Sequence, residues 1–371
     1  VRDLVLGKEI SDVDIATSAT PEEVKSLFAH TVDVGIEHGT VLVLHHHESY
    51  EVTTFRTEGT YQDFRHPDSV TFVRSLEEDL MRRDFTINAL ALNDQEEIVD
   101  YFNGIEDLEH GIIRCVGNPL ERFNEDALRM MRAVRFAGQL GFAIEADTFS
   151  AIRTLKANLE RVAVERMKVE FEKMILSPNR QLAFNAFVES ELYHSCPDFK
   201  EAKEALLTIG EFPLDAISIT GAWILFAYYE QFDSSTLRKV LKNWKSSNEQ
   251  ISTILTGYQT LLARLERDWD AFLAYDCPED LSIEVEQLLP GIGRVEQLEE
   301  MKAVYQQLPI RSMKDIQIDG FGVKEALGLE KMGPIIGEVL QALQSEILSG
   351  RLINENAEIV SWIRNNFNEN K

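Results

Sequence analysis

Ser11-Asp12-Val13-Asp14-Ile15 is the stretch on which the fold of the first part of this chain depends, because it places two carboxylates one residue apart in an apolar run. In a β-strand, side chains alternate between the two faces, so Asp12 and Asp14 point the same way. Two like charges on one face repel each other, and a divalent cation such as Mg²⁺, which prefers oxygen ligands, offsets that repulsion. An isolated pair of this kind also suits a solvated edge strand or a helix-capping turn, so neighbouring motifs must decide.

A third carboxylate opens a later run. Glu51-Val-Thr-Thr-Phe is rich in β-branched residues and predicts a strand that pairs with the strand of Asp12 and Asp14. Three carboxylates from neighbouring strands can hold two Mg²⁺ ions, which clamp the attacking and leaving oxygens of a phosphoryl displacement. Taken alone, Glu51 is compatible with an ordinary surface position, and only the combination favours a two-metal site.

Length and composition limit the class of protein. The 371 residues predict two to four domains, and a hydrophobic content of 44% is enough to fill their cores. The sequence has no run of about 18 apolar residues, so it predicts no membrane span. Cys115, Cys196 and Cys277 are far apart and match neither a zinc pattern nor a disulfide framework, which predicts free thiols in a reducing cytoplasm.

Charge is distributed unevenly along the chain. The formal net charge of −26 argues against a nucleic-acid partner, because phosphate binding needs Lys and Arg. Residues 111–180, however, hold 12 Lys and Arg against 9 Asp and Glu, a net charge of +3. This basic middle of an acidic chain indicates a focused anion site, although a salt-bridged helical surface explains the same numbers.

Arg82-Arg83-Asp84-Phe85-Thr86-Ile87-Asn88 is the second dense group of polar residues. Two arginines can neutralise a triphosphate, and an Asp with an Asn can recognise sugar hydroxyls. The same stretch suits the start of a helix with Asp84 as its N-cap and apolar residues packed behind it. The two interpretations are compatible with each other.

The third group lies in a helical pattern that begins near residue 119. Its apolar ridge consists of Ala127, Met131 and Val134. The adjoining face repeats every third residue through Asp126, Arg129, Arg132 and Arg135. A solvated face with ion pairs between such neighbours is the simpler interpretation, but three arginines with a single Asp exceed what it needs. Gly138 and Gly141 are expected to end this helix.

Other elements are predicted by range. We expect a helix end at 1–7 with Gly7 as its stop, a helix over 17–28, strands near 40–44, 51–55 and 70–73, and a loop over 57–70. The run His45-His46-His47 lies between two strands and favours a turn over a metal site. Helices continue through 147–176, 179–265 and 266–371, with a boundary at Ser177-Pro178.

In this order the groups resemble the class II tRNA nucleotidyltransferases of bacterial type, the CCA-adding enzymes. The matching elements are Val1-Arg2-Asp3, Asp12-Val-Asp14-Ile-Ala-Thr, Glu51-Val-Thr-Thr-Phe-Arg56, Arg82-Arg83-Asp84-Phe-Thr-Ile-Asn88, Glu125-Asp126-x-x-Arg129, Glu165-Arg166 and Gly350-Arg-Leu-Ile-Asn354. The resemblance covers nearly the whole chain. In the family, two glycines precede the first element, whereas this chain begins at Val1, and we therefore expect the sequence to be incomplete there.

The resemblance implies an α+β fold, a small polymerase-β-like nucleotidyltransferase α/β head followed by an extended all-α neck, body and tail. We expect the head at 1–110, a neck that recognises the nucleotide base at 111–178, a helical body at 179–265 and a tail that binds the tRNA elbow at 266–371.

The resemblance also implies template-independent addition of C, C and A to the tRNA 3′ end from CTP and ATP, with Mg²⁺ as the cofactor. The tRNA 3′-hydroxyl would attack the α-phosphorus, and pyrophosphate would leave. Asp12 and Asp14 would hold both metals, and Glu51 would complete the site. The arginines expected to neutralise the triphosphate are Arg2, Arg83, Arg132 and Arg135.

Sugar and base recognition would belong to the second and third groups. Asp84 and Asn88 would read the ribose 2′-hydroxyl. Cytosine and adenine both present an amino donor beside a ring-nitrogen acceptor, and a carboxylate accepts while a guanidinium donates. Asp126 beside Arg129 therefore suits C and A and leaves unpaired groups against U and G, with Glu125 orienting Arg129.

The resemblance further implies a role for the loop over 57–70, which would order the change from C to A addition. The C-terminal helices would contact tRNA, acceptor end and elbow, through basic residues such as Lys314, Lys324 and Lys331. Neither a membrane nor an obligate protein partner is inferred, and the location is cytoplasmic.

Other activities remain open at this point. An A-adding enzyme or a bacterial poly(A) polymerase would share the head. A non-catalytic RNA-binding scaffold predicts lost carboxylates, whereas Asp12, Asp14 and Glu51 are all present. A small-molecule nucleotidyltransferase has no need of more than 250 residues of helices beyond the head.

Overall fold

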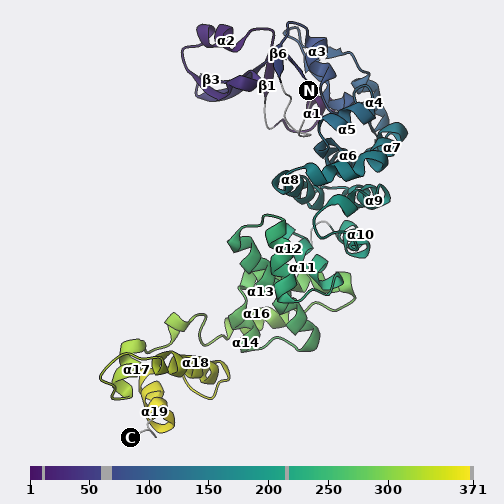
Figure 1. The fold of residues 1–371 in the computed structure, drawn as a ribbon. Coiled ribbons are helices and arrows are strands. Elements are labelled where there is room, and N and C mark those ends of the chain that lie inside the picture. The colour runs from purple at the N-terminus through teal and green to yellow at the C-terminus, as the bar shows by residue number, and fades with distance from the viewer. Residues whose placement is uncertain (11–12, 60–68, 214–216, 368–371) are drawn as a thin grey trace. The chain divides into compact units, whose positions relative to one another are not determined.

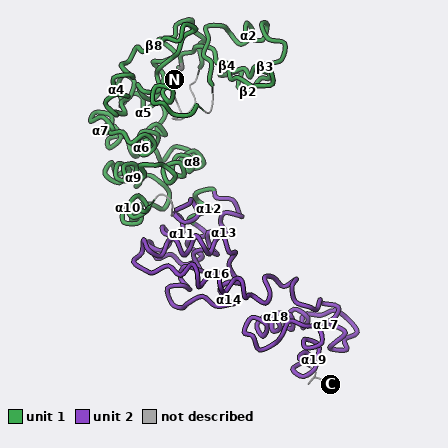
Figure 2. The backbone as a smooth tube through the Cα atoms, turned by 180° about the vertical axis from the view of Figure 1, so that it is seen from behind, with its two compact units in different colours: residues 1–214, 240–245 green, residues 215–239, 246–371 purple. Residues whose placement is uncertain are grey.

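The computed structural model describes residues 1–10, 13–59, 69–213 and 217–367 of the chain. It divides into two compact units, one of residues 1–214 with 240–245 and the other of residues 215–239 with 246–371 (Figure 2). The first unit contains a four-stranded sheet, and the described regular elements of the second unit are all helices. The predicted α+β class, with a small sheet-containing head followed by helices, is confirmed.

The head is built on a sheet with the strand order β1-β4-β3-β2. Its strands are β1 (Asp14–Thr17), β2 (Thr31–Gly35), β3 (Thr40–His45) and β4 (Glu48–Thr54). β1 runs parallel to β4, and the other neighbours are antiparallel. Helix α2 (Pro21–Leu27) packs on one face, where Val24 meets Val41, Val43 and Val52. Figure 1 labels β1 and β3 of this sheet, with α2 beside it. Alternation along the strands places Asp14 and Glu51 on the opposite face.

Local chemistry explains where several head elements begin and end. His46 and His47 adopt φ of 50° and 68° in the tight turn between β3 and β4, which confirms a turn at the histidine run. The predicted helix over 17–28 begins later, at Pro21, because Thr17 still pairs with Thr54 in the sheet. Thr20 and Glu23 then form a capping box at its start.

The predicted loop over 57–70 is shorter than expected. β5 (Arg56–Glu58) pairs with β6 (Val70–Phe72), so strand pairing extends into both ends of that range. The predicted strand near 70–73 is confirmed, and residues 60–68 lie outside the described residues. Upstream, α1 (Arg2–Val5) and Gly7 at φ 62° confirm the expected helix end.

The rest of the first unit is mostly helical. After the sheet come α3 (Leu76–Met81), the 3₁₀ turn η2 (Thr86–Asn88), the hairpin β7 (Leu90–Leu92) and β8 (Ile98–Asp100), and α4 (Gly104–His110). Then follow α5 (Pro119–Glu125), α6 (Leu128–Leu140), α7 (Ala146–Leu155), α8 (Val164–Ile175), α9 (Arg180–Glu189) and α10 (Lys203–Glu211). Between them the short strands β9 (Ile112–Ile113) and β10 (Ala143–Ile144), which the sequence pattern missed, run parallel.

The two glycines of α6 have different roles. Gly141 ends the helix at φ 76°, as predicted. Gly138 does not, because it lies inside α6, where a Cβ would come within 2.7 Å of the Ala183 Cβ. The expectation that both glycines end the helix is therefore wrong, and Gly138 instead permits the close packing of α6 against α9.

The second unit consists of helices around separate apolar clusters. Its helices are α11 (Ile219–Tyr229), α12 (Ser234–Asn243), α13 (Asn248–Glu266), α14 (Ala271–Asp276), α15 (Glu279–Leu288), α16 (Leu298–Gln306), α17 (Gly320–Ala326), α18 (Ile335–Leu348) and α19 (Asn356–Phe367), with α12 ending in the first unit. Val323, Val339 and Ile359 lie in the C-terminal cluster. The three cysteines are free and buried. None of the helices that the structure describes has the length and apolar character needed to cross a membrane.

Candidate active site

Two carboxylates lie side by side on β1 and β4, which are neighbouring strands of the sheet. Asp14 in β1 and Glu51 in β4 are register partners of a parallel pair, and both side chains are exposed. Within the described part of the chain, neither carboxylate has a hydrogen bond or an ion pair to another side chain. Two neighbouring anionic groups with hard oxygen donors and no protein cation suit a divalent metal ion. The described residues contain no cluster of three metal-ligating side chains, and Asp12 lies outside them.

Asp84 and Asn88 are joined through a compact turn. Asp84 Oδ1 accepts hydrogen bonds from the Phe85 backbone N–H at 2.8 Å and from Asn88 Nδ2 at 3.0 Å. Asp84 Oδ2 accepts from Arg132 Nε at 2.8 Å. The alternative prediction, a helix with Asp84 as its N-cap, is wrong, because the helical element here is the three-residue turn η2, whose N-cap is Phe85 and has no side-chain cap hydrogen bond. The second and third groups of the sequence therefore meet at Asp84.

The Asp84 carboxyl stays ionised in a buried place. Burial raises the pKa of Asp84, but the charge of Arg132 and hydrogen bonds from Asn88, Arg132 and Phe85 outweigh burial, so the pKa is lowered overall. An ionised carboxylate accepts hydrogen bonds only. The turn therefore offers a fixed acceptor next to the Asn88 amide.

Arg2 extends this series of contacts from the N-terminal helix. Its guanidinium donates to Asn88 Oδ1 at 2.8 Å and pairs with Asp3 at 2.9 Å. The guanidinium carbons of Arg2 and Arg132 lie 5.0 and 5.3 Å from the ring centre of Phe136. Arg2, Asn88, Asp84 and Arg132 thus form one continuous hydrogen-bonded series. Arg135 lies over the same Phe136 ring at 3.8 Å, so three cations surround one aromatic side chain.

The remaining two arginines of the predicted triphosphate site differ in exposure. The Arg83 side chain is 39% exposed, and among the described residues its ion pair is a long one, 3.5 Å, with Asp79. The Arg135 side chain is 7% exposed and pairs with the buried carboxylate of Glu170 at 2.5 Å. Arg83 therefore keeps donors for a ligand, whereas the donors of Arg135 are directed into the protein.

The residues predicted to recognise the base lie where α5 ends and α6 begins. Arg129 donates to Glu125 Oε2 at 2.6 Å and to the Arg82 carbonyl oxygen at 2.9 Å. Asp126 pairs with Arg166 of α8 at 2.7 Å. Glu125 thus makes the contact that its predicted orienting role requires, and that role stays a prediction.

The arginine face of α6 is not a solvated surface. Arg129 and Arg135 are 9% and 6% exposed, and the partners of this face come from α5, α8 and the head. The expected ion pairs between neighbours three residues apart on α6 are replaced by these longer-range pairs. The ridge residues Ala127, Met131 and Val134 are fully buried, as predicted.

Sequence reasoning missed two residues that organise this region. Glu170 pairs with Arg135 and lies 3.8 Å from Arg132, and Arg122 donates to the Met81 carbonyl oxygen at 3.1 Å. Glu170 follows Arg166 by four residues and stands between the apolar residues Val169 and Phe171. An acidic residue between apolar neighbours indicates a buried charge, and this could have been read from the sequence. The sequence does not show that its partner is Arg135, 35 residues earlier.

Family models match three parts of the chain. The "Poly A polymerase head domain" matches residues 1–114, the "Probable RNA and SrmB- binding site of polymerase A" residues 141–203, and "tRNA nucleotidyltransferase domain 2 putative" residues 216–363. The CCA-adding enzyme of Enterococcus faecalis is 46% identical over 365 residues, which cover 98% of this chain and 90% of that protein. The chain belongs to the CCA-adding enzymes.

Other CCA-adding enzymes agree with this assignment. That of Ligilactobacillus salivarius is 45% identical over 358 residues, 96% of this chain and 88% of the relative. The crystal structure of the Bacillus stearothermophilus CCA-adding enzyme in complex with CTP matches with a TM-score of 0.87 and 36% identity, covering 98% of this chain and 90% of that one. The Thermotoga maritima enzyme complexed with tRNA, at TM-score 0.62 and 22% identity, shows a shared fold alone.

Membership decides among the classes left open by the sequence. CCA-adding enzymes are nucleotidyltransferases, which are generally metal-dependent. The non-catalytic scaffold and the small-molecule transferase are therefore excluded, and CCA addition is favoured over poly(A) synthesis.

Proposed function

We propose that this chain adds C, C and A to the 3′ end of tRNA, using CTP and ATP and no nucleic-acid template. The observation that carries the proposal is the series Arg2–Asn88–Asp84–Arg132, which joins a phosphate-neutralising group to a sugar-reading turn within hydrogen-bonding distances. Names of relatives support it, since the similar B. stearothermophilus structure is described as a complex with CTP.

Asp12 and Asp14 are the proposed holders of two Mg²⁺ ions, and Glu51 is proposed to complete the site as a ligand or as a base. Carboxylate oxygens are the ligands that Mg²⁺ prefers, and the two described carboxylates have no competing cation within the described residues. When bound, such ions neutralise charge on the reacting phosphate and activate the attacking oxygen. The protein contributes the fixed register of two parallel strands that keeps the carboxylates on one face.

The arginines divide the work on the nucleotide. Arg2, Arg83 and Arg132 are the proposed contacts to the triphosphate, where donors placed for developing charge accelerate transfer. Arg135, which the sequence grouped with them, is assigned a supporting position, because its side chain is 7% exposed and pairs with Glu170, whereas the side chain of Arg132 is 33% exposed. Asp84 and Asn88 read the ribose 2′-hydroxyl, and Asp126 with Arg129 reads the base edge of C or A.

The four-part division stays part of the proposal. Residues 1–110 act as the catalytic head, 111–178 as the base-recognising neck, 179–265 as the helical body and 266–371 as the tail for the tRNA elbow. The loop over 57–70, whose residues 60–68 lie outside the described residues, keeps its proposed role in the change from C to A.

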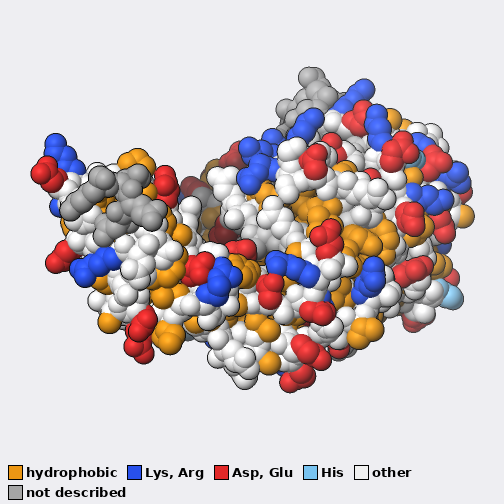
Figure 3. Space-filling view, turned by 90° about the horizontal axis from the view of Figure 1, so that it is seen from below, with side chains coloured by type: hydrophobic (Ala, Val, Ile, Leu, Met, Phe, Trp, Pro, Cys, Tyr) orange, Lys and Arg blue, Asp and Glu red, His pale blue; other side chains and the backbone are white. Residues whose placement is uncertain are grey.

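Binding of tRNA by an acidic chain needs local basic surfaces. On the face drawn in Figure 3, acidic and basic side chains are interspersed. The exposed side of α12 differs, because residues 234–248 contain no Asp or Glu. The exposed basic residues of α12 and of the turn after it, which have no ion pair within the described part of the chain, are Arg238, Lys239, Lys242 and Lys245. We assign these residues to phosphate contacts, besides the predicted Lys314, Lys324 and Lys331.

An extension assay tests the proposal. Three tRNA transcripts that end before CCA, after C and after CC would receive Mg²⁺ with each NTP alone or with CTP plus ATP. Three additions to the first transcript, in the order C, C, A, support CCA addition. Addition only of A to the CC-ended transcript would indicate an A-adding enzyme, and long ladders from ATP would indicate a poly(A) polymerase.

A variant arm of the same assay tests base recognition. Combined replacement Asp126→Ala and Arg129→Ala should abolish the preference for CTP and ATP over UTP and GTP, because matched hydrogen bonds at the base edge carry the discrimination. An unchanged preference in the folded double variant would remove these residues from the proposal.

A further inference from the structure

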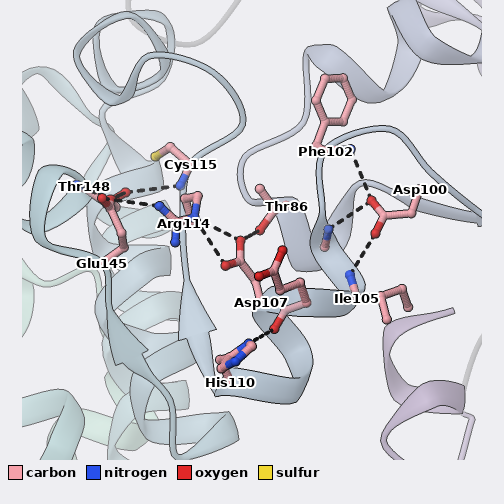
Figure 4. A network of polar contacts seen from close by, with 12 residues as sticks. Thr86, Asp100, Phe102, Ile105, Asp107, His110, Arg114, Cys115, Glu145 and Thr148 are labelled. Atoms are coloured by element: carbon pink, nitrogen blue, oxygen red, sulfur yellow. Dashed lines mark hydrogen bonds and ion pairs between the residues drawn. The ribbon is translucent and has the colours of Figure 1, made fainter.

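Helix α4 packs directly against η2, the turn that carries Asn88. Thr86 of this turn donates its hydroxyl to Asp107 Oδ2 at 2.6 Å (Figure 4). Gly104, at the start of α4, approaches so closely that a Cβ there would overlap the Thr86 carbonyl oxygen. Side-chain and backbone atoms of Thr86 are therefore both held by one helix.

Asp107 is a buried carboxylate with both oxygens engaged. It is 5% exposed, and Arg114 Nε lies 3.2 Å from Oδ1 and 3.1 Å from Oδ2. The Thr86 backbone N–H also donates to the Arg114 carbonyl oxygen at 2.9 Å. The turn is thus fastened to Asp107 and to the segment of Arg114 by independent hydrogen bonds.

The network continues away from the turn. Arg114 lies 3.4 Å from Glu145, which accepts from the backbone and the hydroxyl of Thr148 at 2.8 Å each (Figure 4). Burial raises the pKa of Glu145, but the bonds from Thr148 and the charge of Arg114 outweigh it, so the pKa is lowered overall. Thr148 in turn accepts from the Cys115 N–H at 3.2 Å. Glu145 and Thr148 form the far end of this network. Within the described residues, neither side chain has a hydrogen bond to Thr86.

The position of Thr86 determines what Asp107 can influence. Thr86 and Asn88 belong to the same 3₁₀ turn, and Asn88 donates to Asp84 at 3.0 Å. A hydrogen bond to a sugar hydroxyl requires its partners within about 0.5 Å of the productive geometry. Loss of the hydrogen bond between Thr86 and Asp107 would therefore weaken recognition of the sugar more than binding of the triphosphate.

We propose that Asp107, acting through the Thr86 hydroxyl, is a positioning residue for ribose recognition and supports the choice of ribonucleotides over deoxyribonucleotides. The inference rests on the proposed function, in which Asp84 and Asn88 read the 2′-hydroxyl. Asp107 itself touches neither nucleotide nor metal-binding carboxylates in this scheme. A merely structural Asp107 would change the efficiency of CTP and dCTP equally.

The test compares kcat/KM for CTP and dCTP on a tRNA ending before CCA, well below the unfolding temperature of each variant. Thr86→Val should lower the CTP/dCTP ratio about tenfold, the effect of one lost hydrogen bond of about 1.4 kcal/mol. Asp107→Asn keeps one acceptor oxygen for Thr86 but loses the negative charge, and it should lower the ratio by a smaller factor. Thr86→Ser keeps the hydroxyl and should keep the ratio. Glu145→Gln, which loosens the far end of the network, should lower the unfolding temperature and leave the ratio unchanged.

The outcomes separate this inference from the function on which it rests. An unchanged ratio in folded Thr86→Val overturns the inference even if Asp107→Asn fails to fold. An equal fall of the ratio in Glu145→Gln also overturns it, because the effect is then one of general stability. Asn88→Ala is the reference: if it lowers the ratio while Thr86→Val does not, ribose reading stands and only the positioning role fails. If Asn88→Ala has no effect, both fail.

Discussion

Carboxylates on the sheet and carboxylates that contact α6 differ in exposure and in their partners. Asp14 and Glu51 are exposed and have no protein partner within the described residues. Asp84 and Glu170 are 9% and 4% exposed, and each pairs with an arginine of α6. The counter-charge of Asp84 and Glu170 therefore comes from arginines of α6, whereas no side chain among the described residues supplies one at Asp14 and Glu51.

This contrast separates function from stability. An exposed, unpaired carboxylate contributes little to folding, so its removal leaves the fold intact. A buried, paired carboxylate cannot be removed without leaving an arginine uncompensated in a medium of low polarity. The same residue type should therefore give opposite phenotypes in the two regions.

The largest effect is expected from the sheet. Asp14→Ala and Glu51→Ala should each lower nucleotide incorporation by about 10³-fold, because charge stabilisation at the reacting phosphate is lost. The unfolding temperature should stay at that of the parent chain. Incorporation assays and thermal unfolding would be run beside Glu9→Ala, which removes an exposed carboxylate outside the strands of the sheet. Equal loss of activity in that control would break the comparison.

A buried carboxylate should show the reverse. Glu170→Gln leaves the Arg135 guanidinium buried without its anionic partner, and the free energy of unfolding should fall by roughly 3 kcal/mol. Urea unfolding followed by tryptophan fluorescence measures this loss. The double change Arg135→Met with Glu170→Met should recover most of it, because apolar residues of similar size replace the pair. A single variant as stable as the parent would contradict the assignment.

The comparison between paired and unpaired charges also applies to the basic residues of α12 that are proposed to contact tRNA. Replacing Lys239 and Lys242 of α12 by Ala should raise the Kd for tRNA about tenfold and reduce the slope of log Kd against log salt by about 2. Filter binding over a salt series gives both numbers. Lys302→Ala, which removes a lysine already paired with Glu299 at 2.9 Å, is the matched control and should change neither. An unchanged salt slope in the α12 variant would remove this helix from the tRNA surface.

The smallest effect concerns pH. Folding lowers the pKa of Asp84, so its ionised form stabilises the folded state above the ordinary Asp pKa of about 3.9, and this contribution is lost as pH falls through the folded pKa. Asp84→Asn should be less stable than the parent near pH 6, and the gap should narrow toward pH 3. Unfolding temperatures measured across this range test the sign. A gap that widens on acidification would show that Asp84 is not held ionised.

Family membership and much of the local structure followed from residue order. The helix start at Pro119 is marked by Asn118 and the proline, and the α2 start by Thr20 with Glu23. These signals lie within a few residues of what they determine, so the sequence alone was sufficient. The helix predicted over 17–28 was too long, because no nearby residue indicates that Thr17 pairs with Thr54, 37 residues later in the chain.

Spacing also grouped residues that the tertiary structure separates. Arg132 and Arg135 are three residues apart on one helix. Arg132 nevertheless pairs with Asp84 of the head, whereas Arg135 pairs with Glu170 of α8. Gly138 reads as a helix stop, although its missing Cβ serves the packing of α9. Helical periodicity gives the direction of a side chain, not the identity of what meets it.

Residue types, their periodicity and membership of the family followed from the sequence. Which partners the charged side chains have depends on the tertiary structure, which pairs Asp126 with Arg166 and Arg129 with Glu125. The parallel register that sets Asp14 beside Glu51, the contact of Asp107 with Thr86, and the burial of Arg135 each join residues that are 21 to 37 positions apart. Electrostatic partnership and desolvation depend on distances between atoms, and those distances are set by packing rather than by local order.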